Sequence, residues 1–236
     1  VGGVVDSMWF AEDPKIQSVL MAWQGGIEGG AAAAELLCGI GSPSGKLADT
    51  FARTLEDYPS SYNFHESQDY VDYTDDIYVG YRYFETIPGA DKKVVYPFGY
   101  GLHYGETNYD GMSVDKAESD VNEPVEVFVN VTNDSRYTVN EIVQLYIRHV
   151  DAAEYEPGYQ LKGIEVVKLE PYETKKVKLT LSPRDFAVIE EDGSCVAVPG
   201  IYEISAGGQQ PDDRSTKLTG KRTERIDITR CGEKTG

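Results

Sequence analysis

The sequence predicts an α/β region followed by an all-β, antiparallel β-sandwich. Apolar residues at helical spacing, each group followed by glycines, dominate the first part of the chain, up to about residue 107. Strand-like alternation interrupted by short polar turns dominates residues 124–206. Between the two, residues 106–123 are low in aliphatic side chains and rich in Asp, Glu, Ser and Asn, which indicates a boundary. At 236 residues, the chain is long enough for two ordinary domains.

Two helices are predicted near the beginning of the chain. The first covers residues 14–23, with Asp13 as its N-cap and Pro14 at its first helical position. Its apolar side chains at helical spacing are Ile16, Val19, Leu20 and Trp23. The second helix covers residues 27–37 and stops at Gly39, and its run of alanines allows close approach to a neighbouring element.

The remaining segments of the first region are predicted to be short or irregular. Residues 1–5, V-G-G-V-V, look like the end of a buried strand, and because a domain rarely starts there we expect the chain to be a piece of a larger protein. Residues 48–51 are a candidate strand, and the acidic residues 56–76 predict a long ordered surface loop. In residues 77–104 aromatics recur mostly at every second position, which is typical of strands. We expect these tyrosines to form core and interdomain packing, with a partner for each hydroxyl.

Alternating segments in the second region predict the strands of the sandwich. In residues 141–150, for example, apolar side chains at Val143, Leu145 and Ile147 share one face. Turn sequences such as N-D-S and E-D-G-S separate the segments. The predicted strands are residues 124–130, 141–150, 166–169, 174–181 and 200–206.

Composition argues against several classes of partner. Lys plus Arg number 22 against 40 Asp plus Glu, a net charge of −18, so we expect neither nucleic acid nor a membrane surface as a partner. This charge is compatible with a neutral ligand such as a sugar. The three cysteines match no zinc or redox spacing, so we expect no disulfide framework. We expect two buried thiols and a mobile one near the C-terminus among Cys38, Cys195 and Cys231.

Motifs in a fixed order carry a family resemblance. They are A-W-Q-G-G-I-E-G-G at Ala22–Gly30, S-P-S-G-K-L-A-D-T-F at Ser42–Phe51, the aromatic stretch Ile77–Tyr104, and E-I-V-Q-L-Y-I at Glu141–Ile147 with L-K-G-I-E-V-V-K-L-E-P-Y-E-T at Leu161–Thr174. With them the chain resembles the C-terminal part of a family 3 glycoside hydrolase, the family of many β-glucosidases and β-xylosidases.

The resemblance covers residues 1 to about 210 and implies a division of the chain. Residues 1–107 would be the latter part of the family's α/β sandwich domain. Residues 108–230 would be a linker and a fibronectin type III-like β-sandwich, and residues 231–236 a tail. The sequence departs from the family at His103, where Ser is more frequent, and its final 25 residues match no known motif.

The reaction of this family is retaining hydrolysis of a β-glycosidic bond. It needs an ionised carboxylate as nucleophile and a protonated carboxyl as general acid, about 5 to 5.5 Å apart. By the resemblance, the nucleophile is an Asp on a (β/α)8 barrel domain, and the acid/base is a Glu in a loop upstream of Ala22–Gly30. Neither has a matching position in this sequence. We therefore assign no catalytic residue and no cofactor-binding residue, and we predict that the chain is inactive alone.

Other segments invite a functional interpretation. Glu28, between glycines at a helix start, is expected to accept backbone N–H groups and to play a structural role. Residues 41–46 are faintly similar to a phosphate loop, but Leu47 stands where Ser or Thr is required. The acidic, aromatic loop 65–78 is the best candidate for sugar contact, although such loops are more often solvated surface or interdomain contacts. We predict no metal site, because the histidines are isolated: His65, His103 and His149.

These expectations combine into one prediction with stated alternatives. The chain is predicted to be part of a retaining β-glycosidase, most simply a β-glucosidase acting on terminal non-reducing β-D-glucosyl residues. Its partners would be a β-glucoside or oligosaccharide substrate and the (β/α)8 barrel domain, which could lie on another chain. The alternative within the class is a β-xylosidase. The alternative outside it is a non-catalytic carbohydrate-binding or scaffold module.

Overall fold

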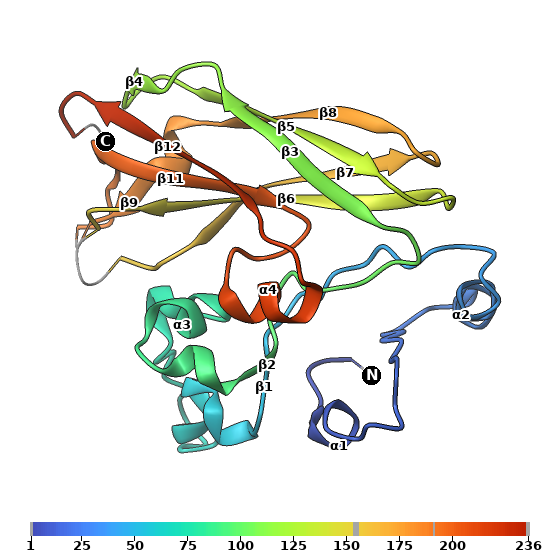
Figure 1. The fold of residues 1–236 in the computed structure, drawn as a ribbon. Helices are drawn as coiled ribbons and strands as arrows, with labels where there is room; N and C mark the ends of the chain where they lie inside the picture. Colours follow the sequence, from blue (N-terminus) through green and yellow to red (C-terminus); the bar gives the residue numbers. More distant parts are fainter. Residues whose placement is uncertain (1, 153–155, 191, 235–236) are drawn as a thin grey trace.

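The computed structural model of the protein describes residues 2–152, 156–190 and 192–234 (Figure 1). A β-sandwich lies above a smaller, irregular part that contains the N-terminal third of the chain. The elements of this smaller part are α1 (Met8–Ala11), α2 (Gly29–Leu37), β1 (Phe51–Ala52), α3 (Tyr81–Thr86) and β2 (Val94–Tyr96). Its strands β1 and β2 pair antiparallel.

Of the two predicted helices, one is confirmed and one is wrong. Of the predicted residues 27–37, Gly29–Leu37 form α2. A Schellman motif ends this helix: Gly39 has φ +73°, its N–H bonds to Leu36 O at 3.0 Å, and Ile40 N–H bonds to Glu35 O at 2.9 Å. Residues 16–26 form no helix. Side chains of the expected apolar stripe are open to solvent, as Val19 shows at 48% exposure. Short helices depend on burial of an apolar face, and the exposure of Val19 and Leu20 leaves too little burial to offset the cost of helix nucleation.

The shorter predicted segments are partly confirmed. Residues 2–5 form no strand and lie mostly exposed, so the expected buried strand is not found there, while Val1 lies outside the described residues. The predicted strand 48–51 is reduced to β1 at its end. The loop 56–76 is confirmed, with 3-10 turns at η1 (Leu55–Asp57), η2 (Pro59–Tyr62) and η3 (Asp76–Tyr78), and a further turn, η4 (Ala90–Lys93), precedes β2.

The aromatic alternation misled the prediction for the start of residues 77–104. Tyr81–Thr86 is the helix α3, not a strand. Residues two positions apart on a helix point to nearly opposite sides. Tyr81 faces the sandwich, where its ring lies edge-on to Tyr146 of β6, and it also stacks on Phe98 of the loop after β2 at 4.5 Å. Tyr83 packs with Phe84 in a second apolar cluster. A helix buried on two sides therefore shows the same alternation as a strand.

The β-sandwich is confirmed, and it contains more strands than predicted. The predicted strands are β5 (Val125–Asn133), β6 (Val139–His149), β7 (Gln160–Leu169), β8 (Thr174–Leu181) and β11 (Gly200–Gly207). Elements without a matching prediction are β3 (Thr107–Val114), β4 (Glu118–Asp120), η5 (Pro183–Phe186), β9 (Ala187–Ile189), β10 (Cys195–Ala197), α4 (Asp213–Thr219) and β12 (Glu224–Cys231). One sheet has the order β4-β12-β11-β6-β7 and the other β3-β5-β8.

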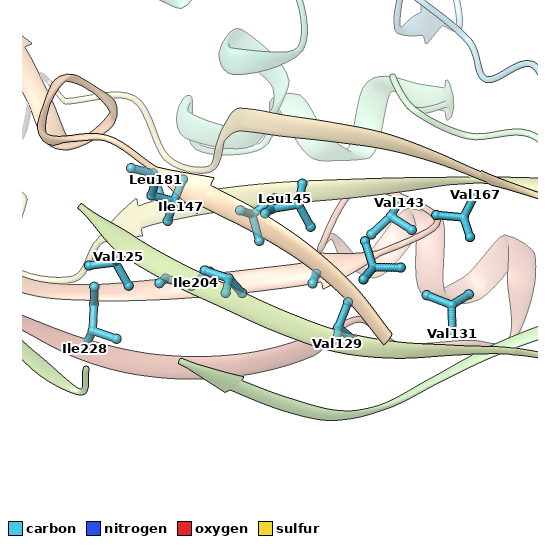
Figure 2. Close-up of a cluster of buried hydrophobic side chains, with 14 of the residues drawn as sticks. Val125, Val129, Val131, Val143, Leu145, Ile147, Val167, Leu181, Ile204 and Ile228 are labelled. Atoms are coloured by element: carbon cyan, nitrogen blue, oxygen red, sulfur yellow. The ribbon is translucent and has the colours of Figure 1, made fainter. Parts of the chain in front are cut away.

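Side chains from the two sheets form the core of the sandwich (Figure 2). On β5 every second residue is fully buried, and Val129 and Val131 face side chains of the larger sheet such as Leu145 and Ile204. Burying such a side chain stabilises the fold by about 1.5–3 kcal/mol. The strict alternation on β5 therefore fixes its register, because a slip of one residue would expose the whole row.

The expected boundary at residues 106–123 contains two strands of the sandwich. It was not recognised as strand because β3 is mostly polar and carries a bulge between Asp110 and Ser113, where Gly111 has φ +61°. β4 pairs in parallel with β12 at the edge of the larger sheet. The division of the chain after residue 107 and the tail at 231–236 stay predictions.

The prediction that two of the cysteine thiols are buried is wrong. Cys38 and Cys195 are exposed and Cys231 is partly exposed, and all are free thiols. Cys38 is the C-cap of α2, a position that faces solvent here. Among the described residues, no helix is both long and apolar enough to cross a bilayer.

Candidate functional site

A cluster of charged residues joins the N-terminal part to the sandwich. We call Lys46, His103, Thr107 and Glu141 the junction cluster. Glu141 on β6 is 1% exposed, and its Oε2 accepts hydrogen bonds from His103 Nε2 at 2.9 Å and from Thr107 Oγ1 at 2.5 Å. Lys46 Nζ lies 3.5 Å from Glu141 Oε1 and donates to Gly101 O at 2.8 Å. The cluster therefore ties two loops of the N-terminal part to the larger sheet.

The surroundings of Glu141 keep it ionised. Burial alone would raise its pKa, but the hydrogen bond from His103, the charge of Lys46 and the hydrogen bond from Thr107 outweigh burial and lower the pKa to about 2. The neighbouring Tyr109 shows the opposite effect, since burial and the negative charge of Glu141 raise its pKa well above the ordinary value. A carboxyl with this pKa holds no proton near neutral pH, so Glu141 cannot serve as a general acid there.

A second contact joins α3 to α4. Asp212 is the N-cap of α4, and it accepts a hydrogen bond from Ser215 N at 2.7 Å. The carboxyl of Glu85 on α3 interacts electrostatically with Asp212. Burial first, and then the negative charge of Asp212, raise the pKa of Glu85 to about 8. Arg214 Nε donates to Val95 O at 2.9 Å, which holds α4 against β2 (Figure 1).

Two tyrosine hydroxyls of residues 77–104 have the hydrogen-bond partners that the sequence predicted for the whole stretch. Tyr81 Oη accepts a hydrogen bond from Leu161 N at 2.8 Å, and its ring lies edge-on to Tyr146 at 6.3 Å. Tyr104 Oη donates to Leu36 O at 2.7 Å. These tyrosines position α3 and α2 and make no polar cluster that resembles a catalytic site.

The acidic, aromatic loop borders a cavity of about 440 Å³. Tyr58, Phe64 and Phe84 contribute aromatic side chains to its wall, and Asp49 and Asp75 contribute carboxyl groups. Residues 55–79 contain seven Asp or Glu and no Lys or Arg, namely Glu56, Asp57, Glu66, Asp69, Asp72, Asp75 and Asp76. This wall therefore combines aromatic surface with strong negative charge.

Local bonds hold the loop beside the cavity in one shape. Asn63 Nδ2 donates to Asp72 O at 2.7 Å and closes the loop. His65 and Asp76 have φ values of +61° and +48°, which are uncommon for residues with a Cβ. Within the described residues, Asp75 Oδ1 is buried and has no hydrogen-bond partner, and burial raises the pKa of this carboxyl.

Other residues singled out from the sequence take structural positions. Glu28 is the N-cap residue of α2, but its side chain accepts none of the backbone N–H groups expected of it. In the phosphate-loop-like segment, the Lys46 ammonium donates a hydrogen bond to Gly101 O and pairs with Glu141. Across the part of the chain that the structure describes, no group of three or more His, Cys, Asp and Glu could hold a metal ion.

The histidines predicted to be isolated have close neighbours. His103 bonds to Glu141, His149 Nδ1 lies 3.0 Å from Glu156 Oε2, and the His65 ring lies 4.3 Å from that of Phe64. The junction cluster was missed because its members are far apart in the sequence. The only sequence signal for it was the unusual histidine at position 103, where the resembled family more often has serine.

Comparison with known proteins identifies the family. The model described as Glycosyl hydrolase family 3 C-terminal domain matches residues 1–104, and the model described as Fibronectin type III-like domain matches residues 141–210. The chain belongs to glycoside hydrolase family 3. The resemblance and the fold class predicted from the sequence are both confirmed.

The relatives of this family 3 chain are named as β-glucosidases. Beta-glucosidase A of Butyrivibrio fibrisolvens is 43% identical over 99% of this chain and 30% of the relative, and thermostable beta-glucosidase B of Acetivibrio thermocellus is 41% identical over 79% and 24%. Among solved structures, the family 3 beta-glucosidase of Bifidobacterium adolescentis matches with a TM-score of 0.77 and 34% identity, over 88% of this chain and 29% of that one. Beta-glucosidase 3B of Thermotoga neapolitana in complex with glucose matches with a TM-score of 0.76 and 31% identity, over 91% and 28%. This chain therefore spans less than a third of the length of these relatives.

Proposed function

We propose that this family 3 chain is the portion of a retaining β-glucosidase that supports the wall of the active site and itself lacks the nucleophile and the acid/base. One observation carries the proposal: the chain aligns over 99% of its length with a β-glucosidase of which it covers 30%. The proposed substrate is a β-glucoside or oligosaccharide with a terminal non-reducing β-D-glucosyl residue. The proposed partner is the (β/α)8 barrel domain of the enzyme, on the same chain or another.

The chemistry of the buried carboxyls supports the lack of catalytic residues. Retaining hydrolysis needs one ionised and one protonated carboxyl facing the same bond. Glu141, the ionised one, is closed off by His103, Thr107 and Lys46. Glu85, the protonated one, lies at the contact with Asp212. Each has a structural role at a different contact, and neither belongs to a motif of the family's catalytic pair.

The exposed apolar surface of the N-terminal part supports a partner. Large exposed apolar patches mark interaction surfaces in soluble proteins. Beyond the sandwich, the exposed apolar side chains include Trp9, Val19, Leu20, Ile27, Leu37 and Ile40. Covering these side chains with the complementary part of the enzyme would remove the apolar surface from water and supply the burial that residues 16–26 lack.

Complementation of activity tests this function. The 236-residue chain and a complementary polypeptide, carrying the barrel and the acid/base loop of the Butyrivibrio relative, are assayed on an aryl β-glucoside separately and mixed. We expect no hydrolysis by either piece alone and hydrolysis by the mixture. Hydrolysis by this chain alone would show that catalytic carboxyls lie within it. An aryl β-xyloside tests the alternative within the class, because faster cleavage of the xyloside would favour a β-xylosidase.

A further inference from the structure

The cavity beside the acidic, aromatic loop has the dimensions of a ligand site. At about 440 Å³ it falls within the range of about 300–1,000 Å³ typical of small-molecule pockets. Its wall comes from chain segments on both sides of η2, including Asp49, Phe64 and Asp75. The hydrogen bond of Asn63 to Asp72 O closes residues 63–72, the segment that carries Phe64. The part of the cavity wall that carries Phe64 is therefore held in place by a local hydrogen bond.

One aromatic ring of this wall is unusually open. Phe64 is 72% exposed, although phenylalanine is normally buried. Its ring leans on His65 at 4.3 Å with a tilt of 56°, a contact that positions it and leaves most of its surface free. In the same wall, Tyr58 meets the buried Phe84 edge-on, with ring centroids 5.8 Å apart. An open, positioned ring in an aromatic wall is suited to stacking on the apolar face of a sugar ring.

The polar groups of the cavity are acceptors. Within the described residues, Asp75 Oδ1 is buried without a hydrogen-bond partner, so a donor that reached it would remove an unfavourable desolvation. Asp49 adds a second carboxyl to the same wall. Ligand hydroxyls are donors of this kind, and hydrogen bonds to a carboxylate are about twice as strong as those between neutral groups.

The charge of the loop restricts the ligand further. Residues 55–79 carry seven carboxyl groups and no Lys or Arg. Lys93 of η4 lies 3.5 Å from one of these carboxyl groups, Asp57, and the others leave the loop with a net negative charge. An anionic ligand such as a uronic acid or a sugar phosphate would be repelled by this charge. The wall therefore selects against anions and favours neutral, hydroxyl-rich molecules.

We propose that this cavity binds the ring of a neutral pyranoside, with Phe64 as its stacking platform and Asp75 and Asp49 as acceptors for its hydroxyl groups. The neutral, hydroxylated class follows from the cavity itself. The choice of a β-glucoside within that class rests on the proposed function.

Calorimetric titration of the 236-residue chain tests the site with two matched probes, methyl β-D-glucopyranoside and methyl β-D-glucuronide at neutral pH. We expect the glucoside to bind and the glucuronide to bind at least tenfold more weakly. Phe64→Ala should weaken binding of the glucoside about tenfold, the equivalent of one aromatic contact. Asp75→Asn keeps the shape of the side chain and removes its charge, and it should also weaken binding about tenfold.

Two control variants lie on the same loop outside the cavity wall. Tyr73→Ala removes an aromatic side chain that is 91% exposed, and Asp69→Asn removes an exposed carboxylate. Neither residue lines the cavity, so both variants should bind the glucoside as the unaltered chain does. Equal weakening in the controls, equal affinity for the two probes, or no binding by the unaltered chain would overturn the site.

The complementation assay separates failure of the site from failure of the proposed function. If the mixture hydrolyses the aryl glucoside but the chain binds no glucoside, the site is wrong and the function stands. If the chain binds the glucoside through Phe64 and Asp75 but no mixture is active, the site stands and the chain is a carbohydrate-binding module.

Discussion

Replacing Glu85 with glutamine removes a carboxyl group that the fold holds in its protonated form. Burial, followed by the negative charge of Asp212, raises the pKa of Glu85 from 4.5 to about 8. In the unfolded chain this carboxyl ionises near pH 4.5, whereas in the folded chain it stays protonated up to about pH 8. The free energy of unfolding therefore falls as the pH rises between these values and is constant above them.

The size of this effect follows from the two pKa values. The full difference between 4.5 and about 8 corresponds to at most roughly 5 kcal/mol of the free energy of unfolding. Glu85 keeps some solvent exposure, which reduces the effect, so we expect about 2 to 3 kcal/mol over the whole range. Glutamine preserves the shape of the side chain and a neutral hydrogen-bonding group. The Glu85→Gln variant should therefore not show the loss of free energy of unfolding that Glu85 causes as the pH rises.

Urea unfolding at pH 6 and pH 9 measures the effect. The unaltered chain should lose roughly 1.5 kcal/mol more than Glu85→Gln between the two pH values, because the interval from pH 6 to about 8 covers somewhat more than half of the range between the two pKa values. Glu165→Gln, at an exposed position on β7, is the matched control and should leave the pH dependence unchanged. Parallel pH curves for the unaltered chain and Glu85→Gln would refute the reasoning, because they would show that Glu85 ionises alike in the folded and unfolded chains.

Three further substitutions test other parts of the structure. Glu141→Gln should destabilise the chain by about 2 to 3 kcal/mol at pH 7 and by less at pH 3. With its pKa lowered to about 2, ionised Glu141 stabilises the fold above pH 4.5, and this stabilisation is lost on acidification. Equal losses in urea unfolding at both pH values would contradict this. Arg230→Met should lower the free energy of unfolding by about 3 kcal/mol, because buried Arg230 donates to Ser119 Oγ at 2.6 Å and to Val121 O at 2.9 Å. An unchanged melting temperature in thermal unfolding would refute this. Val129→Ala should cost about 2 kcal/mol in urea, and a loss below 0.5 kcal/mol would show that the core closes over the missing methyl groups.

Elements with a single buried face were predictable from the sequence. On β5 the alternation of buried and partly exposed residues extends over Val125–Asn133, so the pattern has one meaning. On β12 the inward row continues from Ile228 to Arg230, a fully buried arginine that a hydropathy pattern counts as exposed. The two-sided burial of α3 explains why a strand was predicted there, and the exposure of Val19 and Leu20 explains why the predicted helix at residues 14–23 did not form. In each case the sequence pattern was present, and the surrounding elements decided its meaning.

The candidate sites depend on contacts between distant segments, which a single sequence does not reveal. His103 and Glu141 are 38 residues apart and meet only because the loop after β2 crosses the larger sheet. The loop at residues 65–78 was recognised from its composition alone. The cavity behind it also needs Asp49 and Phe84, which belong to other segments. Composition could therefore indicate the kind of ligand, and only the fold could show the cavity.

The two buried carboxyl groups lie at different contacts of the N-terminal part and have opposite dependence on pH. Glu141 stabilises the fold above about pH 4.5, because His103, Lys46 and Thr107 bind its ionised form. Glu85 destabilises the fold as the pH rises from 4.5 towards 8, because burial and Asp212 oppose ionisation. Taken together, these two groups stabilise the fold most near pH 4.5 to 5, where Glu141 has lost its proton and Glu85 has kept its own. The same fold therefore holds one carboxylate and one carboxylic acid at fixed positions, and it uses both to join its parts.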